Sequence, residues 1–175
     1  MKWNGLALWV WLVPAALQVQ PTVSVGLGVD VITPGERVFL AVTLTTTDDP
    51  QVGKVFFEMS FPRKLLSFIE ATKGRATETA GGEIKTQLRD SEGKIEESIL
   101  RVDVSASRTI PPGVLVKLAF DVSKEAKADS QIKLKNLKLT AQSLEGQPLE
   151  ARGSDGSITV VSEAPVSFAC FFYMH

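Results

Sequence analysis

The chain has 175 residues, with 19 Lys and Arg against 20 Asp and Glu, so its formal net charge is only -1. This balance excludes the basic surface with which proteins hold a nucleic-acid backbone. A single cysteine, Cys170, and a single histidine, His175, exclude zinc clusters, Cys/His pairs and Ser-His-Asp triads within one chain. We therefore expect a protein that binds and is not an enzyme, with no cofactor of its own.

The N-terminal residues have the composition of a secretory signal. Lys2 precedes an uncharged, apolar run over residues 5–17, and small residues near its end suit a cleavage site. The run is shorter than the about 20 apolar residues that span a bilayer. We expect residues 1–20 to be removed. The mature chain would then have no membrane span and would be secreted, to the extracellular space or the cell surface, with the periplasm as the alternative.

Residues 21–162 alternate between apolar and polar side chains, which is the period of half-buried β-strands. The clearest strands are expected at residues 23–31, 38–45, 55–61, 114–122 and 157–161. Turns rich in Gly, Pro and Asp separate the strands, and residues 75–82 are expected to be a polar loop. This spacing predicts one all-β domain, an antiparallel sandwich or barrel.

Three irregularities interrupt the alternation. Gly26 and Gly28 lie inside the first strand and predict close packing of the sheets or a bulge. One-residue slips of phase, within residues 95–104 and near Asn136, each predict a β-bulge.

Two stretches resemble the cohesin family. Residues 53–68 (GKVFFEMSFPRKLLSF) can be laid on the cohesin pattern of an alternating strand that runs into Tyr-Asp-Pro and then Leu-x-Phe/Val. Residues 113–122 (GVLVKLAFDV) are similar to the cohesin strand Gly-Val-Leu-Ala-x-Ile-x-Phe-x-Val, and the likeness continues to residue 160. The resemblance implies a nine-stranded jelly roll of the superfamily that includes cellulose-binding modules. It also implies a dockerin partner, with calcium entering only through that partner, and a role in assembling extracellular polysaccharide-degrading enzymes.

The chain departs from the cohesin pattern where the family recognises its partner. Phe61-Pro62-Arg63 stands in place of Tyr-Asp-Pro, so the aspartate is missing. Lys54 and Phe56 occupy the positions of the Asn-x-Asp pair that hydrogen-bonds dockerin in many cellulosomal cohesins. A basic and an aromatic side chain cannot accept those hydrogen bonds. The resemblance therefore transfers the fold and leaves the protein partner, dockerin-like or other, open.

The candidate partner-binding residues are Phe39, Lys54, Phe56 and Glu58. Phe39 and Phe56 alternate with core-facing neighbours, so each is either an exposed apolar anchor or covered by a loop or by the C-terminal tail. Lys133, Lys135 and Lys138 form a basic row that either protects an edge strand or faces an acidic partner.

Two functions remain from the sequence. The first is a secreted, non-catalytic cohesin-like module that mediates extracellular protein–protein interaction linked to polysaccharide breakdown. The second is a carbohydrate-binding module, which would usually grip sugar on exposed Trp or Tyr rings. All three Trp lie in residues 1–11, and the single Tyr, Tyr173, lies in the aromatic tail of residues 163–175. This distribution favours the first function. The tail is expected to be poorly ordered, and we assign no role to it.

Overall fold

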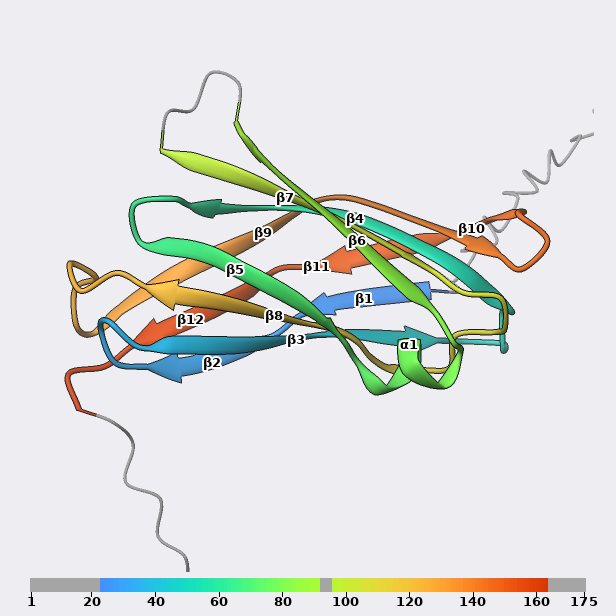
Figure 1. Ribbon diagram of the computed structural model, residues 1–175, viewed down its shortest axis with the longest axis horizontal. Coiled ribbons are helices and arrows are strands. Elements are labelled where there is room, and N and C mark those ends of the chain that lie inside the picture. The colour runs from blue at the N-terminus through green and yellow to red at the C-terminus, as the bar shows by residue number, and fades with distance from the viewer. Residues whose placement is uncertain (1–22, 92–95, 164–175) are drawn as a thin grey trace, which may run out of the picture.

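Two β-sheets pack face to face in the computed structural model, which describes residues 23–91 and 96–163 (Figure 1). The signal sequence and the aromatic tail with Cys170, both expected from the sequence, lie outside the described residues. The first sheet has the order β11 (Ala151–Ser154), β1 (Val23–Leu27), β3 (Arg37–Thr46), β8 (Gly113–Val122) and β5 (Leu66–Lys73). The second has the order β2 (Val29–Ile32), β12 (Gly156–Val160), β9 (Ser130–Ser143), β4 (Val52–Pro62), β7 (Glu97–Ser105) and β6 (Glu83–Asp90), with β10 (Pro148–Leu149) beside β9.

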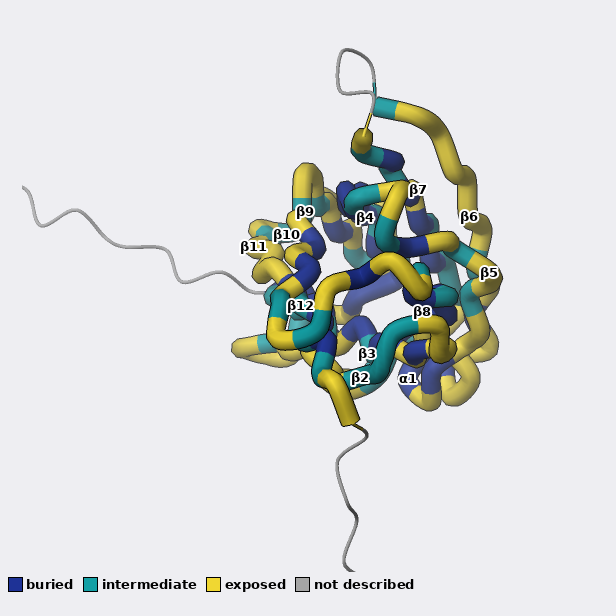
Figure 2. Tube along the Cα trace, turned by 90° about the vertical axis from the view of Figure 1, so that its left-hand side faces the viewer, coloured by how far each residue is buried: buried dark blue, intermediate teal, exposed yellow. Residues whose placement is uncertain are grey.

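The core lies between the two sheets and is built by the alternation of the sequence. The inward rows of β3 and β4 consist of Val38, Leu40, Val42, Leu44, Val55, Phe57 and Met59, all buried. Phe120 of β8 meets Phe61 of β4 edge to face, with 5.1 Å between the ring centroids. Figure 2 shows the buried positions gathered between the sheets, whereas β6 is almost wholly exposed. These observations confirm the predicted all-β sandwich.

The first predicted strand is divided between the two sheets. β1 pairs with β3, and β2 pairs with β12 in the other sheet. Between them lies Gly28, where an added Cβ would stand 2.7 Å from the carbonyl oxygen of Ala41. Only a residue without a side chain permits this approach, so the close packing predicted at Gly28 is confirmed. The pairs β1–β11 and β2–β12 are parallel. The predicted antiparallel arrangement therefore holds for the other strand pairs but not for these two.

The predicted bulge near Asn136 is confirmed. Lys138 of β9 lies opposite Glu58, but Asn136 already lies opposite Met59, so Leu137 is the extra residue. The extra residue offsets the one-residue slip in the alternation, so the exposed lysines before and after the bulge lie on the same side of β9. Ile132, Leu134 and Ala141 lie on the other side and are buried. β9 lies between β12 and β4, so the interpretation of the lysine row as protection of an edge strand is wrong.

Two local predictions are wrong. Residues 75–82 are not simply a loop, because Arg75–Thr79 form the short helix α1. Its buried Thr77 donates a hydrogen bond from Oγ1 to the carbonyl oxygen of Leu115 at 2.8 Å, and Ala76 packs into the core. β7 has no bulge, since its register against β4 and β6 is unbroken from Ser98 to Ser105. Half-buried Ile99 simply belongs to the outward row of that strand.

Candidate partner-binding face

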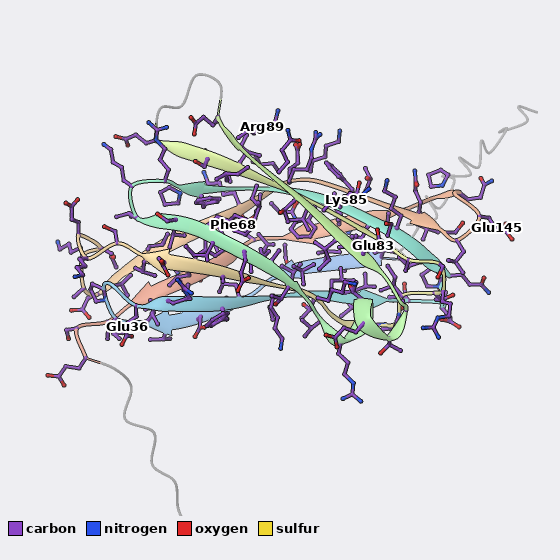
Figure 3. All side chains as sticks on the ribbon, in the orientation of Figure 1. Glu36, Phe68, Glu83, Lys85, Arg89 and Glu145 are labelled. Carbon is purple, nitrogen blue, oxygen red and sulfur yellow. The ribbon has the colours of Figure 1, made fainter. Side chains whose placement is uncertain are left out.

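The outward side of the second sheet carries most of the candidate residues, and we call it the charged face. Because Val55, Phe57 and Met59 point inward, the residues between them on β4 point outward. Neighbouring strands add their own outward residues in register. Across β9, β4, β7 and β6, two rows of the face are Thr140, Phe56, Asp103 and Lys85, and then Lys138, Glu58, Arg101 and Gln87. Figure 3 labels Glu83, Lys85 and Arg89 along β6.

Glu58 is buried within this face, with only 7% of its surface exposed. Its Oε1 accepts hydrogen bonds from Arg101, at 3.1 Å from Nε and 2.9 Å from Nη2, and from Arg89 Nη2 at 3.3 Å. A buried carboxylate is stable only with such partners. Glu58 is therefore engaged inside the protein, and its effect on the face is to hold Arg101 in one orientation.

Phe56 is half-buried at the centre of the face. The guanidinium carbon of Arg101 lies 5.1 Å from the ring centroid, and the ammonium of Lys138 lies 5.8 Å from it. Both distances are within the range of cation–π attraction, which contributes about 0.5–1 kcal/mol at exposed sites. The ring is thus framed by cations from the two neighbouring strands.

A hollow of about 230 Å³ opens beside Phe56. Lys54, Arg101, Asp103 and Lys138 line it together with the ring, and Thr140 and Gln142 complete it. The ammonium of Lys54 pairs with Asp103 at 3.2 Å. The hollow therefore contains three cations and one carboxylate, next to an aromatic surface.

Phe39 lies apart from this cluster. It is on β3, in the other sheet, opposite Ala119, and 59% of its surface is exposed. The structure therefore brings Lys54, Phe56 and Glu58 together and leaves Phe39 on a different face. Arg101 and Asp103 were not predicted from the sequence to belong to this face. Their alternation with buried Val102 and Val104 was visible, but nothing local indicated that β7 lies beside β4.

The turn that replaces Tyr-Asp-Pro closes the end of β4. The amide of Leu65 donates a hydrogen bond to the carbonyl oxygen of Pro62 at 3.1 Å. Arg63, at the position after the proline, forms an ion pair with Asp90 of β6 at 3.3 Å. The turn is therefore retained without the aspartate.

Neither a metal site nor a membrane helix is found in the described ranges. Residues 23–91 and 96–163 contain no group of three or more His, Cys, Asp or Glu side chains placed to hold an ion. Within the same ranges, no helix has the length and apolar character to cross a membrane.

The family model that describes the Cohesin domain matches residues 21–160. The chain belongs to the cohesin family. Cohesin domains are non-catalytic protein–protein interaction modules, which agrees with the expectation that this chain is not an enzyme. No curated protein sequence matches this cohesin at a significant level.

Solved cohesin structures share the fold at low sequence identity. Coh-OlpA of Clostridium thermocellum, solved in a type I cohesin–dockerin complex, has a TM-score of 0.68 and 17% identity, covering 80% of this chain and 99% of its own. A non-cellulosomal cohesin from the archaeon Archaeoglobus fulgidus has a TM-score of 0.64 and 18% identity, covering 81% and 92%. CaCohA2 of Clostridium acetobutylicum has a TM-score of 0.63 and 19% identity, covering 84% and 96%. At these identities the similarity concerns the fold alone.

Proposed function

We propose that this cohesin is a secreted, non-catalytic module that binds an extracellular protein partner through the charged face, and that this binding is linked to polysaccharide breakdown. Family membership supports a protein partner, and Coh-OlpA is one relative solved in complex with a dockerin. The apolar N-terminal run supports export. A dockerin-type module is the partner class we place first.

The observation that carries the proposal is the position of Phe56. It is an aromatic side chain at the centre of a mainly charged and polar face, beside a hollow, with the oriented Arg101 over its ring. Aromatic and arginine side chains at the centre of a patch account for much of the binding energy at protein interfaces. Lys54 and Phe56 replace the pair of side chains that accept hydrogen bonds in many cellulosomal cohesins. At this position the partner must therefore contact the N–H donors of a lysine and an aromatic ring.

The test compares Phe56→Ala with Phe39→Ala, because the two residues lie on outward positions of different sheets. The immobilised chain is used to capture proteins from the supernatant of the source culture. We expect Phe56→Ala to weaken capture of a specific partner about tenfold or more, as removal of an interface anchor does. Phe39→Ala should leave capture unchanged, and thermal unfolding should show that both variants are folded.

Two outcomes would contradict the proposal. If capture depended on Phe39 and not on Phe56, the interface would lie on the outward side of the first sheet, which contains β3. Binding to glycans on an array, with no protein captured, would favour the carbohydrate-binding module instead. That alternative has little support at present, since residues 23–163 contain neither Trp nor Tyr.

A further inference from the structure

Lys138 differs from the other cations of the hollow in its partners. Lys54 is paired with Asp103, and Arg101 is held by Glu58. Among the carboxylates of the described residues, none lies within ion-pair distance of the Lys138 ammonium, whose neighbour is the ring of Phe56. A cation over a ring keeps its N–H donors free for another acceptor.

Arg101 has unused donors as well. Its Nε and Nη2 both donate to Oε1 of Glu58, at 3.1 and 2.9 Å. A guanidinium carries five N–H groups in a rigid plane, so the bonds to Glu58 fix the plane and leave further N–H groups over the hollow. Because Glu58 is buried, this orientation is set before any partner arrives.

We propose that the hollow receives a carboxylate side chain, of an aspartate or a glutamate, from the protein partner; this rests on the function proposed above. Lys138 and Arg101 donate to the carboxylate oxygens, and the Phe56 ring packs against the methylene groups of the incoming side chain. Thr140 and Gln142 supply further polar contacts at the rim. The partner surface that meets the charged face is therefore acidic.

The charges around the hollow support an acid over an amide or hydroxyl. Lys85 and Arg89 of β6 and Lys135 of β9 are exposed beyond the hollow. An anion is attracted by all of these groups, whereas a neutral side chain gains only hydrogen bonds. A lysine or arginine of the partner would be repelled by the cations that line the hollow.

The direct test uses two synthetic probes, a capped hexaglutamate and a capped hexaglutamine peptide. Amide chemical shifts of the isotopically labelled chain are followed by NMR at low ionic strength. We expect hexaglutamate to shift the amides around Phe56, Arg101 and Lys138, and hexaglutamine to leave them unchanged. The proposal is overturned if both peptides shift these amides equally, or if hexaglutamate shifts none of them.

Charge substitutions locate the site. Lys138→Glu should weaken hexaglutamate binding about tenfold, and the neutral Lys138→Gln about threefold. Lys117→Glu is the matched control, because Lys117 is exposed on β8 of the other sheet and the change of charge is the same. Equal losses in Lys138→Glu and Lys117→Glu would mean that only the net charge matters, and would sink the proposed site.

The same variants distinguish the two proposals. If a captured protein partner depends on Phe56 but binds Lys138→Glu as well as the unchanged chain, the proposed function stands and the carboxylate site is wrong. If hexaglutamate binds at the hollow while no protein depends on Phe56, the acid site stands and the proposed function fails.

Discussion

The outward sides of the two sheets start from the same sequence pattern and reach different surfaces. We call the outward residues of β3 and β8, which include Arg37, Phe39, Lys117 and Asp121, the second face. Each face has one phenylalanine and an arginine–carboxylate pair. On the charged face Phe56 is half-buried between cations, whereas 59% of Phe39 is exposed.

The difference arises from the strands on either side. Phe39 lies opposite Ala119, which has only a methyl side chain. Phe56 lies opposite Asp103 and Thr140, and long basic side chains from the adjacent row reach over it. Cross-strand neighbours decide what an outward residue becomes. An outward aromatic residue on a strand is thus half-buried only where side chains of the adjacent strands frame it.

The largest expected effect comes from shifting the register of β9 next to its bulge. Deletion of Leu137 alone would leave both rows on their sides, because Asn136 and Lys138 already lie opposite the adjacent residues Met59 and Glu58. Insertion of one alanine after Lys138 instead moves residues 139–143 to opposite sides of the sheet. Thr140 and Gln142 would then face the core, so we expect the chain not to fold, as judged by circular dichroism and proteolysis. Leu137→Ser is the control, because Leu137 is 50% exposed. It should change the free energy of unfolding by about 0.5 kcal/mol or less. A folded insertion variant would show that β9 can absorb the added residue and that its register does not fix the face.

A smaller effect is expected from the two carboxylates. Glu58→Ala leaves Arg101 and Arg89 without their shared acceptor, and we expect a loss of about 1–3 kcal/mol in urea unfolding. Asp121→Ala removes the partner of Arg37 on the second face, where the two side chains are 47% and 45% exposed. The exposed pair should contribute much less, and its loss should shift the melting temperature only slightly. If Glu58→Ala and Asp121→Ala lowered the free energy of unfolding equally, burial of the carboxylate would not account for the contribution of either ion pair.

The sequence predicted those features that depend on neighbours along the chain. Alternation placed Lys54, Phe56 and Glu58 on one side of a strand, and the slip near Asn136 located the bulge in β9. Gly28 was recognised as a point of close approach, and the residues at that point carry the chain from one sheet to the other. The resemblance to cohesins gave the family.

Features that depend on contacts distant in sequence could not be predicted. The burial of Glu58 requires Arg101, which is 43 residues away, and Arg89 from a third strand. The hollow requires β9 and β7 to flank β4 in a given register. The helix α1 was missed because one turn is too short to show a helical period, and tertiary packing stabilises it.

The smallest effect is the pH dependence of the exposed pair on the second face. Arg37 donates hydrogen bonds to Asp121, at 2.7 Å from Nε and 3.3 Å from Nη2, and these bonds hold the pKa of the Asp121 carboxyl below its ordinary value. A lowered pKa in the folded state means that the pair stabilises the protein above the ordinary pKa of aspartate, about 4, and that this contribution is lost as the pH falls through the lowered value. We therefore expect the difference in stability between the unchanged chain and Arg37→Gln to be constant near neutral pH and to shrink on acidification below about pH 4. Added salt should shrink the same difference at neutral pH, because both groups are accessible to solvent. A difference that persists at acid pH would mean that Arg37 acts through packing of its methylene groups and not through Asp121.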